Sequence, residues 1–263
     1  VRSMAQDDAH IYCTPEQLET ELASFVEMTR EVYDAFGFEN VEVTLQTRPE
    51  TFLGRVELWD AAERALAGAV EKAGYAVTEL PGEGAFYGPK IGFDFRDVLD
   101  RSWTLATVQI DCAMPERFEL GYVTPDGSSA TPMMLHRAVL GSIERFIAIL
   151  LEHTGGRLPL WLAPEQVRVL PVSEKVLTYA EDVAGRAGRH GLRATADLRN
   201  EKLGYKVREA QLQKIPVIVV VGEREEGAGT VAPRSGPGEG EVLPLDEFVE
   251  RTVAAARVPG GVS

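Results

Sequence analysis

The first residues of the sequence that could do chemistry lie within five positions of one another. Gln6, Asp7, Asp8 and His10 supply an amide, two carboxylates and an imidazole. In an extended strand alternate side chains share a face, so Gln6, Asp8 and His10 would point to the same side. An imidazole is a candidate metal ligand, although a single histidine is more often an ordinary surface or core residue.

A second candidate group begins at His136, which precedes Ser142 and Arg145. Apolar residues at helical spacing predict a long helix over residues 134–152. These apolar residues are Leu135, Val139, Ile143, Phe146 and Leu150. His136 would then stand at the start of this helix, and Ser142 and Arg145, three positions apart, would share one of its faces.

The elements that hold these residues can be predicted from capping residues and periodicity. We expect a helix over residues 14–36, a strand over 41–45 and a helix over 58–73. Thr14 and Gln17 have the spacing of a capping box for the first helix, and Gly37 can end it. Alternating residues between positions 84 and 123 predict antiparallel strands with common faces. They are Ile91, Phe93 and Phe95, then Trp103, Leu105, Thr107 and Gln109.

The second half of the chain alternates strands with helices, which predicts a mostly parallel sheet flanked by helices. The expected strands cover residues 167–172, 193–196 and 217–221. The expected helices open at Ser173, Lys202 and Leu245. A glycine-rich stretch over residues 227–240 is expected to be a hairpin or a flexible edge. The fold class is therefore α+β in the first part and α/β in the second.

Composition indicates a globular protein without a membrane segment. The 263 residues exceed the usual size of one domain, and 44% of them are hydrophobic and 26% charged. A net charge of −14 argues against a protein that coats nucleic acid, although it leaves room for a local basic face. Two cysteines, Cys13 and Cys112, are too few for a disulfide framework, and this favours a reducing cytoplasm.

Two segments resemble sequence motifs of the threonyl-tRNA synthetases. Residues 6–13 resemble the end of class II motif 2, and residues 133–146 resemble motif 3. Residues 85–90, 107–111 and 161–164 fit the segments between and after these motifs, in the family's order. The resemblance implies an antiparallel-sheet catalytic domain over residues 1–158, incomplete at its N-terminus, and an α/β anticodon-binding domain with a mixed sheet over residues 159–263.

The resemblance implies a zinc ion that selects threonine. In the family one Cys and two His hold the ion, and His10 and His136 match the two histidines. Gln6 and Asp8 would bind the threonine substrate. The Cys ligand is expected from an earlier segment, together with motif 1 and the motif 2 arginine, and Cys13 does not match it. We therefore expect the 263-residue chain alone to be inactive.

The same resemblance implies a site that forms threonyl-adenylate from threonine and ATP with Mg²⁺. The expected catalytic residues are Arg145, Lys90 and Gln109. Substrate binding is expected from Gln6, Asp8, Tyr87, Lys90 and Ser142, and ATP binding from Met4, Gln109, Ser142 and Arg145. Without the resemblance, an ion pair with Glu144 or Asp111 would be the simplest role for Arg145.

Some residues depart from the family's usual pattern in the first domain. They are Met4, Thr104, Leu105, Ala106, Cys112 and Met114. Met4 replaces a phenylalanine that stacks on adenine, a loss of roughly 1 kcal/mol. We expect several of these residues to line one pocket. A diverged paralogue that excludes an inhibitor or admits another hydroxy amino acid is one explanation, and drift in a damaged copy is another.

The second domain would bind the anticodon of tRNA(Thr) through residues that match the family's contacts. They are Asn200, Arg208, Lys214, Glu225 and Arg234. Lys214 stands where arginine is usual and lacks the planar guanidinium. A solvated charged face is the alternative. Further alternatives are a prolyl or histidyl enzyme, which the histidine pair disfavours, and a non-catalytic tRNA-binding module. The full-length protein is expected to be a cytoplasmic homodimer.

Overall fold

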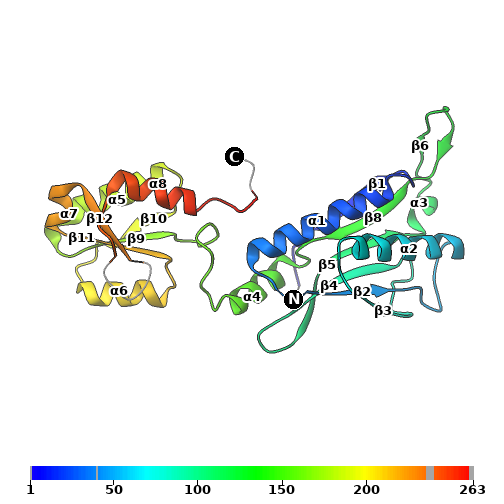
Figure 1. The fold of residues 1–263 in the computed structure, drawn as a ribbon, viewed down its shortest axis with the longest axis horizontal. Coiled ribbons are helices and arrows are strands. Elements are labelled where there is room, and N and C mark those ends of the chain that lie inside the picture. The colour runs from blue at the N-terminus through cyan, green and yellow to red at the C-terminus, as the bar shows by residue number, and fades with distance from the viewer. Residues whose placement is uncertain (1, 40, 235–239, 261–263) are drawn as a thin grey trace. The chain divides into compact units, whose positions relative to one another are not determined.

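The computed structural model describes residues 2–39, 41–234 and 240–260. The chain divides into two compact units, Val1–His153 and Thr154–Ser263, drawn as ribbons in Figure 1. The sequence predicts this boundary after residue 158. Each unit has its own sheet and its own helices.

The first unit is built on a six-stranded sheet in the order β1-β8-β5-β4-β2-β3. Its strands are β1 (Ala9–Cys13), β2 (Val41–Gln46), β3 (Val77–Leu80), β4 (Lys90–Arg96), β5 (Ser102–Asp111) and β8 (Met133–Ala138). All neighbouring strands are antiparallel except β2 and β3. A short helix, α3 (Met114–Arg117), and a two-stranded hairpin, β6 (Tyr122–Val123) with β7 (Ser129–Ala130), connect β5 to β8.

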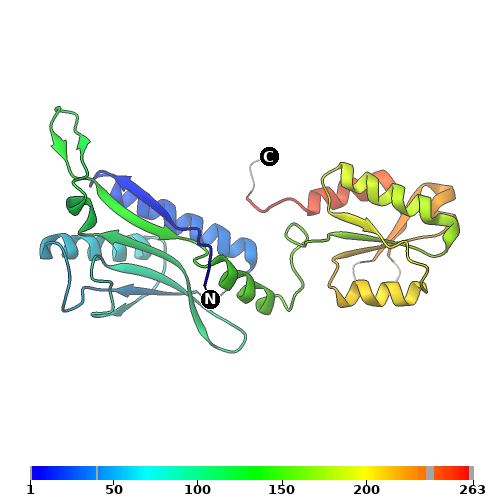
Figure 2. The ribbon, with the colours of Figure 1, turned by 180° about the vertical axis from the view of Figure 1, so that it is seen from behind.

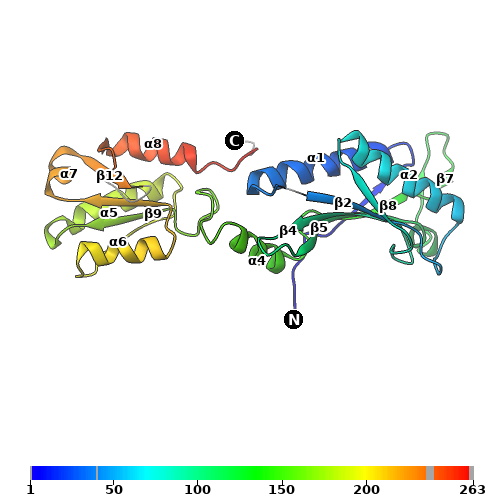
Figure 3. The ribbon, with the colours of Figure 1, turned by 60° about the horizontal axis from the view of Figure 1, so that its bottom comes forward.

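Two helices, α1 (Leu18–Phe36) and α2 (Val56–Lys72), lie on one side of this sheet, as Figure 3 shows. The Phe25 ring of α1 lies 6.1 Å from the Phe93 ring of β4, centroid to centroid. Strand side chains alternate, and Lys90 is one residue before Ile91 and three before Phe93, so it points to the opposite side of the sheet. The sheet therefore buries one apolar face under helices and leaves the other for polar residues.

The first helix begins later than predicted and ends as predicted. Residues 15–17 form turns, and α1 begins at Leu18. The Gln17 side chain still accepts the Thr14 backbone N–H at 2.9 Å, which is one half of a capping box. Gly37 ends the helix with a φ of 73°, in the left-handed region.

The predicted common face of Trp103, Leu105, Thr107 and Gln109 is wrong, because β5 contains a β-bulge. The register with β4 shifts at Leu105, so that Phe93 lies opposite Ala106 and Asp94 opposite Thr104. The inserted residue reverses the alternation along β5, and the residues before and after it cannot share one face. At the bulge the Tyr33 hydroxyl accepts the Ala106 backbone N–H at 2.7 Å.

The predicted helix over residues 134–152 is wrong in its first half. Residues Met133–Ala138 form strand β8 between β1 and β5, and the helix α4 covers only Ile143–His153. His136 therefore lies in the middle of a strand. Leu135 and Val139 are buried in the structure as in the prediction, so their apolar character suits either element.

The second unit is a five-stranded mixed sheet in the order β10-β9-β11-β12-β13. Its strands are β9 (Val167–Pro171), β10 (Ala194–Ala196), β11 (Val217–Val221), β12 (Thr230–Arg234) and β13 (Leu243–Pro244). Its helices are η1 (Glu174–Val176), α5 (Leu177–Arg189), α6 (Leu203–Leu212), α7 (Glu223–Ala228) and α8 (Leu245–Ala255). Figure 1 and the reverse view in Figure 2 show α5 and α8 on one face and α6 on the other.

The order of strands and helices in this unit agrees with the sequence prediction, except that α7 was not predicted. Strands β9, β10 and β11 are parallel, whereas β12 and β13 are antiparallel. Part of the predicted glycine-rich stretch, residues 235–239, lies outside the described residues. No described helix combines the length and the apolar character needed to span a bilayer. Cys13 and Cys112 are both buried free thiols.

Candidate functional site

A row of polar side chains crosses the face of the six-stranded sheet that lies opposite α1 and α2. The strand register places His10 opposite His136, His136 opposite Gln109, and Gln109 opposite Lys90. Residues directly opposite one another on antiparallel strands have their side chains on the same face. Four predicted site residues from four strands therefore share one surface.

The two histidines meet in this row. The centroids of the His10 and His136 rings are 4.6 Å apart, and the ring planes are inclined by 77°. His10 is exposed, and the His136 side chain is 23% exposed. The expectation that two imidazoles far apart in the sequence converge is confirmed.

Asp111 fixes the environment of His136 and was not predicted as a site residue. Its Oδ2 lies 3.0 Å from His136 Nε2, and its Oδ1 accepts the backbone N–H groups of Ala113 and Met114 at 2.9 and 2.8 Å. Burial alone would raise the pKa of Asp111, but these hydrogen bonds lower it below the usual value. Its place two residues after Gln109 in one strand was the signal that could have found it, because such residues share a face.

Tyr87 packs against His136, with ring centroids 5.6 Å apart. Burial and the carboxylates of Asp111 and Asp8 raise the pKa of its phenol. The turn that carries Tyr87 approaches β5 closely, because a Cβ atom on Gly88 would lie 1.8 Å from the Ile110 carbonyl oxygen. Only glycine permits this approach, which brings Tyr87 into the row.

Gln109 and Lys90 continue the row away from the histidines. The Gln109 side chain is buried, and its Nε2 donates to the Gly88 carbonyl at 2.8 Å. Its Oε1 remains as an acceptor, so the residue both anchors the Tyr87 turn and faces the row. Lys90 is half-buried beside it.

A second group of predicted residues lies where the chain before β1 meets the start of α4. Gln6 forms a bridge with Ser142, and the Ala5 backbone N–H donates to Glu144 at 2.9 Å. The Asp7 carboxylate accepts the backbone N–H groups of residues 139, 140 and 141. These contacts hold the exposed side chains of Met4, Gln6 and Asp8 along this loop.

Arg145 forms neither of the ion pairs that would have been its simplest role. Its guanidinium donates to the Thr104 carbonyl at 3.0 Å, and the Ser142 hydroxyl accepts its backbone N–H at 3.4 Å. Glu144 and Asp111 have other partners. Within the described part of the chain, Arg145 is therefore an exposed cation without a carboxylate partner.

The residues that depart from the family pattern do not gather in one place. Thr104, Leu105 and Ala106 lie near the start of β5, whereas Cys112 and Met114 follow its other end. Seven steps of extended strand separate Thr104 from Asp111, which is about 23 Å. Thr104 contacts Arg145, while Leu105, Ala106 and Cys112 are buried. These residues therefore do not line one pocket, and the prediction of a single altered pocket is wrong.

The histidine pair could hold a metal ion together with a further donor. Two imidazoles with adjacent rings on one face suit zinc, and one of them carries the carboxylate partner that metal-ligating histidines commonly have. Across residues 2–39, 41–234 and 240–260, no group of three or more His, Cys, Asp and Glu residues is arranged to hold a metal ion. His10 and His136 thus fit as two ligands of a set that needs a further donor.

The residues predicted to contact the anticodon lie on several elements of the second unit. Asn200 precedes α6, Arg208 is on α6, Lys214 follows it with a φ of 60°, Glu225 is in α7 and Arg234 ends β12. Asn200 and Arg208 are exposed. The Glu225 carboxylate accepts the Gly222 backbone N–H at 2.8 Å, which gives it a capping role. The Nε atom of Arg234 is buried and has no hydrogen-bond partner among the described residues.

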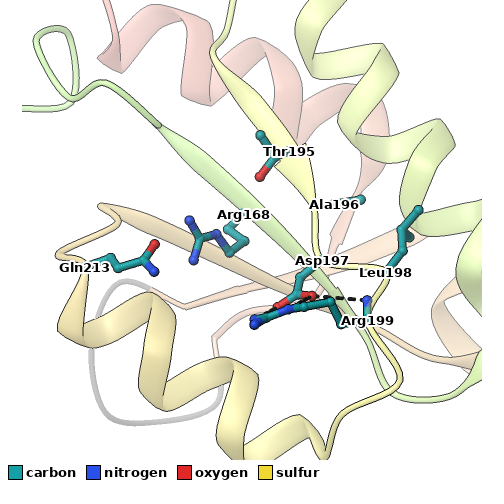
Figure 4. A pocket seen from close by; sticks show the side chains of 7 residues that line it. All are labelled: Arg168, Thr195, Ala196, Asp197, Leu198, Arg199 and Gln213. Atoms are coloured by element: carbon teal, nitrogen blue, oxygen red, sulfur yellow. Dashed lines mark hydrogen bonds and ion pairs between the residues drawn. The ribbon is translucent and has the colours of Figure 1, made fainter.

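An open pocket of about 640 Å³ is lined in part by Arg199 and Gln213, which precede Asn200 and Lys214 in the sequence. Figure 4 shows its lining side chains. They are Arg168, Thr195, Ala196, Asp197, Leu198, Arg199 and Gln213. Arg168 Nε donates to Glu165 and Arg199 Nε to Asp197, at 2.8 and 2.9 Å. The sequence prediction missed Arg168, although a charged residue within the apolar strand β9 is a signal of a polar site.

Comparison with known families assigns both units. Residues 1–154 match the family model described as "tRNA synthetase class II core domain (G, H, P, S and T)", and residues 166–254 match the "Anticodon binding domain".

Curated relatives match 95% of the chain at about 50% identity. The chain is 50% identical over 252 residues to the threonine–tRNA ligase of Janthinobacterium sp. (strain Marseille). The aligned region covers 95% of this chain and 40% of that protein. It is 51% identical over 253 residues to the threonine–tRNA ligase of Caldanaerobacter subterraneus subsp. tengcongensis, and that alignment covers 95% of this chain and 39% of the relative. The chain thus spans about 40% of the length of these relatives.

Two solved structures share the fold. One is described as the RNA binding domain of threonyl-tRNA synthetase from Cryptosporidium parvum Iowa II, with a TM-score of 0.93 and 38% identity. The other is a putative threonyl-tRNA synthetase, ThrRS-1, from Aeropyrum pernix, with a TM-score of 0.82 and 27% identity. Each comparison covers 100% of this chain and 66% of the solved chain.

Proposed function

We propose that this chain, which belongs to the class II tRNA synthetases and within them to the threonyl-tRNA synthetase family, takes part in the ATP-dependent ligation of threonine to tRNA(Thr). The reaction would pass through threonyl-adenylate. The observation that carries this proposal is the meeting of His10 and His136 on the polar face of the sheet, 4.6 Å apart between ring centroids. The proposal includes a homodimer of the full-length protein in the cytoplasm.

Threonine would be selected at the histidine end of the row. His10 and His136 would hold a zinc ion together with a cysteine from elsewhere in the full-length protein. A bound zinc with open positions can coordinate the amino and hydroxyl groups of threonine, so that valine, which lacks the hydroxyl, is rejected. Asp8 and Gln6 would bind the threonine substrate from the chain before β1. Tyr87 would bound the side-chain pocket.

Adenylate formation would take place between this end and the start of α4. The reaction joins the threonine carboxylate to the α-phosphate of ATP with loss of pyrophosphate, and it depends on alignment and charge neutralisation. Arg145 is suited to this role because it is exposed and lacks a carboxylate partner among the described residues. Lys90 and Gln109 would contact the adenylate, Ser142 and Met4 would border the nucleotide, and Mg²⁺ would accompany ATP.

The second unit would bind the anticodon. Exposed Asn200 and Arg208 can reach splayed bases, and Lys214, Glu225 and Arg234 complete the matched set. The neighbouring pocket adds the planar guanidinium groups of Arg168 and Arg199, on which bases can stack. Their partners Glu165 and Asp197 neutralise them, so their contribution would be stacking and shape more than charge.

The proposal is tested in a chimeric synthetase in which this chain replaces the matching part of the Janthinobacterium relative. His136→Ala should remove bound zinc and lower threonine-dependent ATP–pyrophosphate exchange by about a hundredfold or more. His153→Ala is the control, since His153 contacts the Gly37 carbonyl away from the row. Full zinc content and full exchange in His136→Ala would refute the proposal.

A second candidate is a synthetase of this family with altered substrate or inhibitor sensitivity. The observation in its favour is that Met4 is 61% exposed and carries no aromatic ring that could stack on adenine. The same chimera, assayed with threonine, serine and valine and with inhibitors of the relative, separates the two. Activation of threonine alone with ordinary inhibition would exclude this candidate. Tight tRNA binding without any activation would indicate a non-catalytic tRNA-binding module.

A further inference from the structure

Asp111 is a carboxylate that the proposed mechanism does not use. Its side chain has no exposed surface, whereas the His136 side chain beside it is 23% exposed. A buried carboxylate normally has a specific set of hydrogen-bond partners. Here the two carboxylate oxygens have different hydrogen-bond partners.

One oxygen of Asp111 is committed to the backbone. Oδ1 accepts the N–H groups of Ala113 and Met114 at 2.9 and 2.8 Å, at the turn that starts α3. Two donors on one oxygen fix the plane of the carboxylate. Oδ2 is thereby held toward β8, where it lies 3.0 Å from His136 Nε2.

The direction of the hydrogen bond follows from the chemistry of the two groups. An ionised carboxylate can only accept, so the proton of this bond must belong to His136 Nε2. A neutral imidazole with its proton on Nε2 keeps its lone pair on Nδ1. The flanking rings of His10 and Tyr87, 4.6 and 5.6 Å from His136 between centroids, limit reorientation of the imidazole.

We propose that Asp111 is a positioning residue that holds His136 as the Nε2–H tautomer and so presents Nδ1 as the atom that binds a metal ion. This inference rests on the zinc site of the proposed function. Metal ligands among histidines are commonly held in this way by a carboxylate on the other ring nitrogen, and loss of such a partner weakens metal binding by about 10- to 100-fold. Asp111 itself does not touch the substrate in this proposal.

The test is the Asp111→Asn variant, because an amide reverses the hydrogen bond. Asn can still accept the Ala113 and Met114 N–H groups through its oxygen, which leaves its NH₂ group facing His136. An NH₂ group donates, so Nε2 must become the acceptor and the proton must move to Nδ1. Long-range ¹H–¹⁵N correlation spectra of the labelled 263-residue chain report the tautomer of each histidine directly.

We expect wild-type His136 as the Nε2–H tautomer and the variant as the Nδ1–H tautomer. The matched control is Asp94→Asn, since Asp94 is also a buried carboxylate of this sheet but hydrogen-bonds to Thr44 and Thr104. It should leave the His136 tautomer unchanged. A wild-type proton on Nδ1 overturns the proposal without any variant, and so does an unchanged tautomer in a folded Asp111→Asn chain.

Metal binding by the chimeric synthetase, which supplies the further donor, gives the second readout, with Co²⁺ as the probe and its visible absorption as the signal. Wild type and Asp94→Asn should bind Co²⁺ alike, and Asp111→Asn should bind it 10- to 100-fold more weakly. Equal affinity in all three contradicts the role of Asp111. If wild type binds no Co²⁺, the zinc site of the proposed function fails in this chain, while the tautomer spectra still decide what Asp111 does.

Discussion

At the scale of single residues, the arginines of this protein differ in whether a carboxylate neutralises them. Arg168 and Arg199 are paired with Glu165 and Asp197. Arg145 takes part in no ion pair with the described residues and donates to a backbone carbonyl. A cation already paired in the folded protein has less to offer to a phosphate or a base. The exposed arginines without partners are therefore the better candidates for contacts with ATP and tRNA.

Arg208 provides a prediction at this scale. It is exposed on α6, and the described residues offer it no ion pair. Arg208→Ala should weaken binding of a tRNA(Thr) anticodon stem-loop by about tenfold, which corresponds to about 1.4 kcal/mol, with little change in thermal stability. Fluorescence anisotropy at fixed salt measures the affinity. Arg189→Ala, at the end of α5 on the other face of the sheet, should bind like wild type, and an equal loss in both variants would indicate non-specific attraction.

At the scale of elements, the hairpin between β4 and β5 is held by one carboxylate. Asp97 accepts the backbone N–H groups of Leu99 and Arg101 and the Trp103 indole N–H, at 2.9, 2.9 and 2.8 Å. Burial by itself would raise the pKa of Asp97, but these hydrogen bonds, and one from the Arg101 side chain, lower it well below the usual value. The hairpin therefore depends on the ionised form of this residue.

The dependence predicts how stability changes with pH. A carboxyl group with a lowered pKa in the folded state stabilises the protein above its unfolded pKa of about 3.9, and the contribution is lost as the pH falls through the folded value. Asp97→Asn should therefore lower the thermal midpoint by several degrees at pH 7, and the difference from wild type should shrink below about pH 4. Asp100→Asn, with one ion pair in the same hairpin, should change little at either pH. A constant difference across pH would contradict this prediction.

The turn that carries Tyr87 gives a second prediction about an element. Gly88→Ala would place a Cβ atom 1.8 Å from the Ile110 carbonyl oxygen, so the turn must move away from β5. We expect a loss of about 1–3 kcal/mol in unfolding free energy, the scale of overpacking in a core. Gly68→Ala, inside α2 with no atom within 4 Å of the new Cβ, should gain about 0.5–1 kcal/mol. Urea unfolding measures both, and equal effects would show that the close approach is not needed.

At the scale of the whole molecule, the two units have separate cores. The sheet of the second unit packs Phe248 and Val249 of α8 against Val219 and Val231. Phe248→Ala should destabilise this unit by about 3–5 kcal/mol. In a Trp161→Phe background the remaining tryptophans, Trp59 and Trp103, report only on the first unit.

The expected outcome is that the tryptophan fluorescence midpoint in urea stays where it was, while the circular dichroism curve gains an earlier transition. Trp161→Phe alone is the reference. If both signals shift together, the two units unfold as one cooperative system, and their separate cores do not determine stability independently.

Much of the fold and part of the site could be predicted from particular residues. Gly37 and the unbroken apolar run Val217–Val221 act locally, so the end of helix α1 and the bounds of strand β11 agree with the prediction. The order of the motifs placed His10 and His136 in one site, and their rings do meet. Leu135 and Val139, however, fit a helical stripe as well as a buried strand, and the predicted helix was wrong there.

The amino-acid sequence by itself determined the types of most elements, the family and the convergence of the two histidines, because these depend on local conformational preference and on motif order. Only the tertiary structure decided that residues 133–138 are a strand, since the hydrogen bonds of β8 come from β1 and β5, whose paired residues lie between 23 and 128 positions earlier in the sequence. The same pairing sets Asp111 against His136. Contacts between distant strands are long-range, and no local pattern in either segment specifies them.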